Sequence, residues 1–137
     1  MRIAAVLTAL LAAVGCGTAW SETGETPSTD LTVTVWPEGR SEGDSRRFTL
    51  RCAPAAGTLP RRAIACQKLA TMTSPFAPLR KDLACTQIYG GPQQAVIAGT
   101  FRGHRIWTLV KATDGCEIAR AKKLGFLLPG FSFAGSS

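Results

Sequence analysis

The residues best suited to chemistry are the five cysteines of the 137-residue chain. Cys16 follows an apolar run near the N-terminus, and Cys52, Cys66, Cys85 and Cys116 are spread over the rest of the sequence. In an exported protein such thiols form disulfides, and four cysteines allow three different pairings. They do not come in the close pairs of a zinc site, and the chain has one histidine, so we expect no metal and no other cofactor.

Cys85 opens a short stretch that reads Cys85-Thr86-Gln87-Ile88-Tyr89, followed by Gly-Gly-Pro. The Gly-Gly-Pro turn ends any helix or long strand, so we expect the residues before it to lie on a surface loop. A disulfide at Cys85 would fix one end of that loop. A stiff, exposed and extended peptide of this kind can lie in the cleft of another protein.

Catalytic residues are not evident in the sequence. The lone histidine, His104, stands beside Gly103 at an expected connection between strands, and the few carboxylates lie mostly in loops or near the N-terminus. A hydrolase needs a nucleophile with an oriented base within reach. We therefore predict that the protein is not an enzyme and that His104 is a surface residue of a hairpin.

The overall composition is that of an ordinary globular domain, with 45% hydrophobic and 18% charged residues. The formal net charge is +7, but Lys and Arg are scattered, and the only run is Lys122-Lys123 with Arg120 nearby. A dedicated nucleic-acid site would gather its cations in one tract. We therefore expect a solvated basic surface and no nucleic-acid partner.

The N-terminal residues 1–15 have the pattern of a signal peptide, with a positive start and an apolar run too short to span a bilayer. Small residues at Gly17 and Ala19 suit ordinary signal peptidase. Alternatively, Ala13-Val14-Gly15-Cys16 resembles a bacterial lipobox, in which Cys16 is lipidated and becomes the new N-terminus. We favour the second interpretation, with residues 16–30 as a polar tether and residues 31–137 as the domain. The expected location is extracellular, either free or anchored through Cys16 to the outer face of the cell membrane.

Hydrophobic alternation within the domain predicts five strands, at residues 31–36, 47–52, 94–98, 105–111 and 126–133. The first two form a hairpin, residues 99–103 form a tight connection, and residues 105–111 form the long central strand. A helix is predicted for residues 61–71, with Ala63, Cys66 and Ala70 on its inner face, and a short helix or coil for residues 117–123. Because most strands are neighbours in sequence, the pattern favours an antiparallel sheet with one helix on its face.

Several of these segments, taken together, resemble the Streptomyces subtilisin inhibitor family. They are Cys85-Thr86-Gln87-Ile88-Tyr89, the segment Thr49-Leu50-Arg51-Cys52-Ala53-Pro54, the spacing of the four cysteines, and Gly103-His104-Arg105 leading to Cys116. The resemblance covers roughly residues 31–131. It implies an α/β sandwich, that is, an α+β fold with a five-stranded antiparallel sheet, about two helices and a homodimer formed through the sheet.

The resemblance also implies roles for individual residues. It pairs Cys52 with Cys66 and Cys85 with Cys116, and it makes Gln87–Ile88 the bond presented to a serine protease, with Cys85, Thr86 and Tyr89 as flanking contacts. Members of the family more often have Lys, Arg or Met where this chain has Gln87. They commonly have Asn where this chain has Asp114, so we expect Asp114 to support the loop as an acceptor without an amide donor.

The implied function is a secreted or surface-anchored inhibitor of subtilisin-like serine endopeptidases. The alternative is a non-inhibitory surface lipoprotein that uses the same fold as an interaction module. The two differ in whether the chain inhibits serine proteases.

Overall fold

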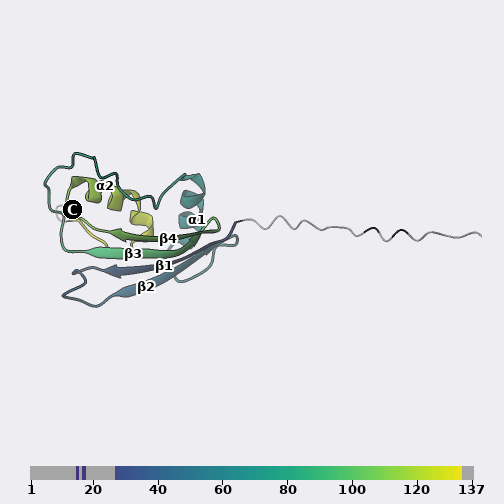
Figure 1. Cartoon of the computed structure of the whole chain (residues 1–137). Coiled ribbons are helices and arrows are strands. Elements are labelled where there is room, and N and C mark those ends of the chain that lie inside the picture. The colour runs from purple at the N-terminus through teal and green to yellow at the C-terminus, as the bar shows by residue number, and fades with distance from the viewer. Residues whose placement is uncertain (1–14, 16, 18–26, 134–137) are drawn as a thin grey trace, which may run out of the picture.

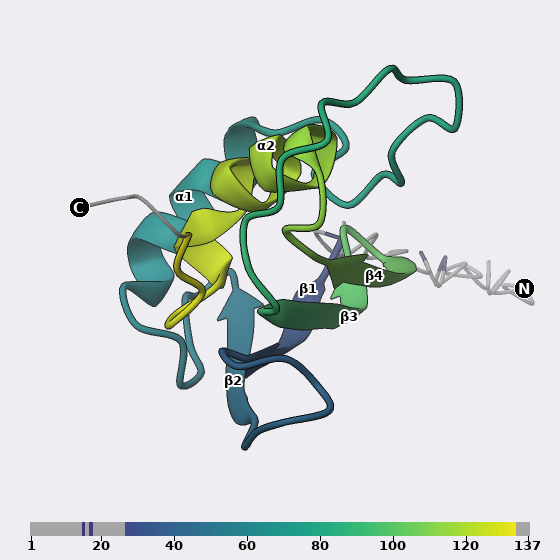
Figure 2. The same cartoon turned by 90° about the vertical axis from the view of Figure 1, so that its left-hand side faces the viewer.

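The computed structural model describes residues 15, 17 and 27–133 of the chain (Figure 1). In chain order its elements are the strands and helices β1 (Thr29–Trp36), β2 (Arg46–Cys52), α1 (Arg62–Thr71), β3 (Gln94–Phe101), β4 (His104–Val110), α2 (Gly115–Lys123) and the 3-10 helix η1 (Gly125–Leu127). Both α-helices lie on one side of a single sheet (Figures 1 and 2), so the chain has an α+β fold. Neither helix within the described part is long and apolar enough to cross a membrane.

The sheet has four antiparallel strands in the order β2-β1-β3-β4, and the prediction of five strands is wrong. The expected fifth strand, residues 126–133, begins within η1 and continues as irregular chain. Leu127 and Leu128 are adjacent and both buried, which the alternation of a strand does not allow. Pro129 then has no N–H for a ladder, and Gly130 has a φ of 82°.

Two strand assignments also needed correction at β3 and β4. Gly99 lies within β3 rather than in a connection, and it pairs with Leu31 of β1. The position requires glycine because a Cβ there would stand 2.2 Å from the carbonyl oxygen of Asp30 on β1. The turn is made by Arg102 and Gly103, whose φ angles of 50° and 81° suit a two-residue hairpin loop. Within the described residues β4 pairs with β3 alone, so β4 is an edge strand and not the central one.

The core lies between the sheet and the helices. Its fully buried strand residues alternate along the chain, as a sheet with one covered face requires: Leu31, Val33, Val35, Leu50, Ala95, Ile97 and Val110. Ala65 and Leu69 of α1, Ala121 of α2 and Leu124 at the C-terminal cap of α2 pack against this face. The inner face predicted for α1 is wrong in part, because Ala63 and Ala70 are exposed and Cys66 is only half-buried. Alanine is so weakly apolar that its positions in the sequence do not show which face of a helix is buried.

The N-terminal boundary of the domain lies slightly earlier than expected. β1 begins at Thr29, so Thr29 and Asp30 belong to the sheet and not to the tether assigned to residues 16–30. Cys16 and most of residues 1–15, the predicted signal peptide, lie outside the described residues.

Candidate functional site

A long connection without helix or strand joins α1 to β3, from residue 72 to residue 93. It projects beyond α2 and the sheet (Figure 2). Irregular connections of this length in a compact domain are uncommon and often carry function. Residues 85–90, the exposed loop, contain its two most solvent-accessible large apolar side chains, with Ile88 59% and Tyr89 64% exposed. Gln87 and Thr86 are exposed as well.

The N-terminal side of the exposed loop is fixed to the start of α2. Cys85 and Cys116 form a disulfide with their Cα atoms 5.3 Å apart, and the Gly115 N–H donates to the carbonyl oxygen of Thr86 at 2.9 Å. This approach requires glycine, because a Cβ at position 115 would lie 1.9 Å from Oγ1 of Thr86. Residues 85 and 86 are thus held by one covalent bond and one backbone hydrogen bond.

The C-terminal side of the exposed loop is fixed in a similar way. The Gly90 N–H donates to the carbonyl oxygen of Ala112 at 2.6 Å, and Gly90 is buried. A Cβ at position 90 would lie 2.9 Å from Cδ1 of Ile118, so the backbone reaches this position because residue 90 has no side chain. Gln93, only 3% exposed, donates its amide to the carbonyl oxygens of Gly90, at 2.9 Å, and of Ser132.

Both attachments reach one short stretch of chain, residues 112–116, the backing segment. Gln87, Ile88 and Tyr89 lie between the two attachments and point no large side chain into the core. A segment held in this way loses little conformational entropy when it docks. The arrangement is therefore suited to presenting a short extended peptide, here the one containing the bond Gln87–Ile88.

The other disulfide, Cys52–Cys66, joins β2 to α1. Both disulfides have the pairing that the family resemblance implied.

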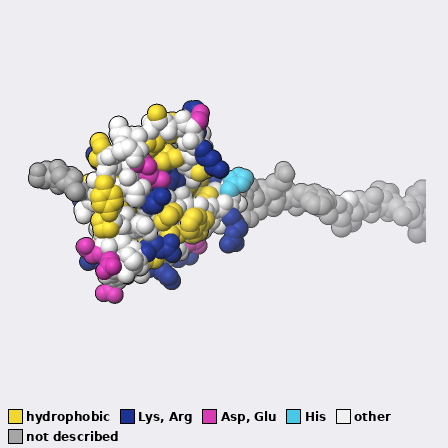
Figure 3. Space-filling model, turned by 60° about the vertical axis from the view of Figure 1, so that its left-hand side comes forward, with side chains coloured by type: hydrophobic (Ala, Val, Ile, Leu, Met, Phe, Trp, Pro, Cys, Tyr) yellow, Lys and Arg dark blue, Asp and Glu magenta, His cyan; other side chains and the backbone are white. Residues whose placement is uncertain are grey.

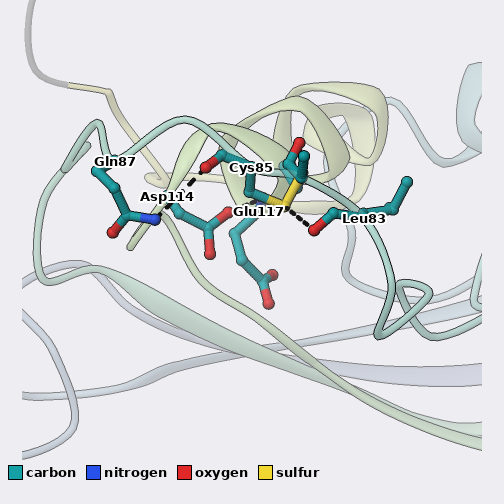
Figure 4. Close-up of a disulfide and its surroundings, with 7 residues drawn as sticks. Leu83, Cys85, Gln87, Asp114 and Glu117 are labelled. Atoms are coloured by element: carbon teal, nitrogen blue, oxygen red, sulfur yellow. Dashed lines mark hydrogen bonds between the residues drawn. A yellow bond between two sulfur atoms is a disulfide. The ribbon is translucent and has the colours of Figure 1, made fainter.

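Helix α2 begins earlier than expected, and Asp114 is the reason. The predicted helix or coil began at residue 117, but α2 begins at Gly115 with Asp114 as its N-cap, and Oδ1 of Asp114 accepts from the Glu117 N–H at 2.9 Å. Asp is among the preferred residues for this position because its carboxylate satisfies a free N–H of the first turn. Figure 4 shows the Asp114 carboxylate beneath the exposed loop, between Gln87 and Glu117. Asp114 thus fixes the helix that carries the loop's attachments.

The Gln87 side chain lies back along its own loop. Its Nε2 donates to the carbonyl oxygen of Cys85 at 3.4 Å, near the long limit for a hydrogen bond (Figure 4). The weak contact leaves the side chain free to turn outward at little cost. In the same view a disulfide sulfur approaches the carbonyl oxygen of Leu83 at 3.7 Å, but a disulfide sulfur has no proton to donate.

Cys85, Asp114 and Cys116 lie close together, with their potential ligand atoms within 4.8 Å of one another. The sulfur atoms are bonded to each other, and metal binding needs the thiolate form. The group therefore offers one carboxylate and is a structural site of the loop.

The sequence-based prediction missed Ala112, Gly115 and Gln93. Gly115 and Ala112 act through their backbone, for which the sequence carries no signal. Gln93 could have been found, because it is in phase with the inward-facing Ala95 and Ile97 of β3, where a polar residue indicates a buried hydrogen bond.

The sequence also contains a pattern that the prediction overlooked. Gly39-Arg40-Ser41-Glu42-Gly43 matches the G-x-S-x-G elbow of serine hydrolases, which needs a strand-to-helix turn. Here the pattern lies in the loop between β1 and β2, and Ser41 is exposed. His104 is exposed at the opposite end of the sheet, since it pairs with Phe101 whereas Trp36 pairs with Gln94. Ser41 therefore lacks a histidine base.

The charged side chains form no single tract on the face shown in Figure 3, where Lys and Arg alternate with acidic and apolar groups. Such dispersal does not provide the continuous cationic surface that nucleic-acid backbones bind.

Comparison with known proteins gives one family. The family described as "Subtilisin inhibitor-like" matches residues 26–111, more than half of the chain. The match includes the exposed loop but ends before Asp114 and Cys116. A comparison with curated proteins finds no match. Among solved structures, the crystal structure of Streptomyces caespitosus sermetstatin in complex with Bacillus licheniformis subtilisin is similar, with 24% identity and a TM-score of 0.47 over 76% of this chain and 99% of that chain.

Proposed function

The chain belongs to the subtilisin inhibitor-like family, and we propose that it inhibits subtilisin-like serine proteases by presenting the Gln87–Ile88 bond as a substrate. Members of this family are protease inhibitors and not enzymes, in agreement with the prediction that the chain has no catalytic activity.

The observation that carries the proposal is the attachment of the exposed loop on both sides of this bond. The disulfide Cys85–Cys116 and the Gly115–Thr86 hydrogen bond hold the residues before it. The Gly90–Ala112 hydrogen bond holds the residues after it. Both lead to the backing segment, so cleavage of the bond between Gln87 and Ile88 would leave two ends that cannot separate.

The mechanism follows from this geometry. The protease serine attacks the carbonyl carbon of Gln87 while its histidine takes the serine proton. The histidine then gives this proton to the nitrogen of Ile88 as the Gln87–Ile88 bond breaks, so that Ile88 leaves as an amine. The new amine stays near the acyl-enzyme because Gly90 remains bound to Ala112. Its effective concentration is therefore high, and re-formation of the peptide bond competes with hydrolysis. The protease therefore stays bound, because the cleaved chain that it produces can be joined again to give the intact chain.

Gln87 favours subtilisin-like enzymes over trypsin-like ones. A broad apolar pocket accepts an uncharged side chain of medium length. A trypsin-like pocket has a buried carboxylate, which Gln87 leaves unpaired on binding, at a cost in free energy.

The direct test is the inhibition constant of the wild-type protein against subtilisin and trypsin. We expect inhibition of subtilisin at one inhibitor chain per enzyme and inhibition of trypsin weaker by at least about tenfold, the equivalent of 1.4 kcal/mol. Absence of inhibition across a panel of serine proteases would favour the alternative, a non-inhibitory surface module on the same fold.

We also propose that the inhibitor acts outside the cell, anchored through lipidated Cys16. The support is the signal-like sequence of residues 1–15 and the Ala13-Val14-Gly15-Cys16 motif. An anchored inhibitor would protect the surface that carries it.

We propose a homodimer formed through the face of the sheet opposite the helices. Trp107 is 64% exposed on this face, opposite Ala98, and the neighbouring pair Val96 and Leu109 is partly exposed. Figure 2 shows both helices on the other side. Sedimentation velocity should give a dimer for the wild type and a monomer for Trp107→Glu. Ile64→Glu, which places the same charge at a 47% exposed residue on the helical side, should stay dimeric. A monomeric wild type would contradict the dimer.

A further inference from the structure

We propose that Arg120 is a positioning residue for the exposed loop, acting through helix α2 and the connection that leads into the loop. The inference rests on the proposed function for its effect on inhibition. Its effect on the loop itself is independent of that function.

Arg120 joins three parts of the structure. It lies on α2, and its Nη1 donates to the carbonyl oxygen of Leu109 on β4 at 2.9 Å. Its Nη2 donates to Oγ1 of Thr108 on the same strand and, at 3.3 Å, to the carbonyl oxygen of Ala77 in the connection 72–93. One guanidinium thus links the helix to the edge strand and to the chain that precedes the exposed loop.

The burial of the Arg120 side chain favours these contacts. Burial lowers the pKa of its guanidinium, and the Coulomb interaction with Glu117 offsets part of this effect. Its Nε is buried and has no hydrogen-bond partner among the described residues, and the same holds for Oε2 of Glu117. The guanidinium therefore donates to β4 and to the connection rather than to Oε2 of Glu117. Lysine could not bind the three acceptors of Arg120 in the same way, because its three N–H donors are all on one nitrogen atom.

The link to the loop runs through the first turn of α2. Gly115 and Cys116 of this turn hold Thr86 and Cys85, and Ala112 in front of it holds Gly90. Ala121 and Leu124 bury the later part of the helix in the core. We therefore expect α2 to stay docked without Arg120, while its first turn and the chain near Ala77 become less fixed.

Arg102 provides a matched control. Its guanidinium likewise makes three hydrogen bonds, here all to backbone carbonyl oxygens: those of Leu69 at 2.9 Å, Ala70 at 3.3 Å and Thr73 at 3.4 Å. Leu69 and Ala70 lie in the last turn of α1, and Thr73 lies at the start of the connection 72–93. None of the three belongs to the backing segment. Removing Arg102 should reduce stability as removing Arg120 does, but should leave the exposed loop as it is.

The experiment measures amide hydrogen exchange by NMR at Gly90 and Gly115, in Arg120→Met, Arg120→Lys and Arg102→Met. Arg120→Met should speed exchange at both amides at least about tenfold, with unchanged exchange in β1 and β3, because local opening precedes global unfolding. Arg120→Lys should give a smaller increase, and Arg102→Met none. Cleavage of the Gln87–Ile88 bond by subtilisin should accelerate in the same order.

Two results would overturn the inference. One is unchanged exchange at Gly90 and Gly115 in the Arg120 variants. The other is an equal increase in Arg102→Met, which would show general destabilisation. If Arg120→Met does not fold, Arg120→Lys decides by the same criteria. Failure of the wild type to inhibit subtilisin would refute the proposed function alone, because hydrogen exchange is measured without any protease.

Discussion

Removing the Cys85–Cys116 disulfide should turn the protein from an inhibitor into a substrate. The perturbation is the double variant Cys85→Ser/Cys116→Ser. In the wild type this bond closes a loop over a sequence separation of 31 residues. The chain-entropy relation gives a stabilisation of about 3.7 kcal/mol for a loop of that length. The variant also loses the covalent attachment two residues before the presented bond, so the cut ends can separate.

The second disulfide provides a control, because it should stabilise the folded protein by a nearly equal free energy. Cys52–Cys66 spans 14 residues, for which the same relation gives about 3.0 kcal/mol. Cys52→Ser/Cys66→Ser should therefore lower the free energy of unfolding almost as much, without changing the exposed loop. The two variants separate the effect of stability from the effect of the attachment.

The assay incubates each protein with a small amount of subtilisin, at a temperature where circular dichroism shows all of them folded, and locates cuts by mass spectrometry. We expect the Cys85/Cys116 variant to be cut between Gln87 and Ile88 and then degraded. The wild type and the Cys52/Cys66 variant should keep inhibiting. Equal degradation of the two variants, or first cuts elsewhere, would refute the reasoning.

Three further predictions concern single residues. Gln87→Lys should strengthen trypsin inhibition at least about 30-fold, the equivalent of about 2 kcal/mol for pairing the buried carboxylate. Gln67→Lys, with the same change on the exposed face of α1, should not alter the inhibition constant. Asp114→Ala should lower the free energy of unfolding by about 1 kcal/mol because the N-cap is lost. Asp114→Asn should keep the stability of the wild type and tighten inhibition, because it adds an amide donor under the loop. Equal stability of the two variants in urea denaturation would contradict this prediction. Cys16→Ala should remove the protein from the membrane fraction or leave it unprocessed, and a soluble wild type whose N-terminus lies beyond Cys16 would rule out the anchor.

Most strands of the sheet could be predicted from the sequence because apolar and polar residues alternate along them. Leu31, Val33 and Val35 point inward and their neighbours outward, so β1 could be placed within two residues. The same reasoning failed for residues 126–133, where apolar side chains are buried without alternation around Pro129. Burial in a core does not by itself distinguish a strand from irregular chain.

The site could be predicted in part. The composition of the exposed loop and its following turn indicated an exposed, extended segment, and the family resemblance gave the disulfide pairing. The supports of the loop were not predictable, because Ala112 and Gly115 contribute backbone atoms brought near by the fold. From the sequence, Arg120 could be interpreted only as a surface cation, because a helical pattern does not reveal which carbonyl oxygens a guanidinium will reach.

Re-formation of the cut bond shows whether the exposed loop holds both cleaved ends in place. Protein cleaved between Gln87 and Ile88 is isolated and incubated with a catalytic amount of subtilisin. If the exposed loop holds both ends in place, intact chain should reappear, and the ratio of intact to cleaved chain should approach the value reached from intact protein. Cleaved protein that never regains the bond, and is degraded further, would contradict the account.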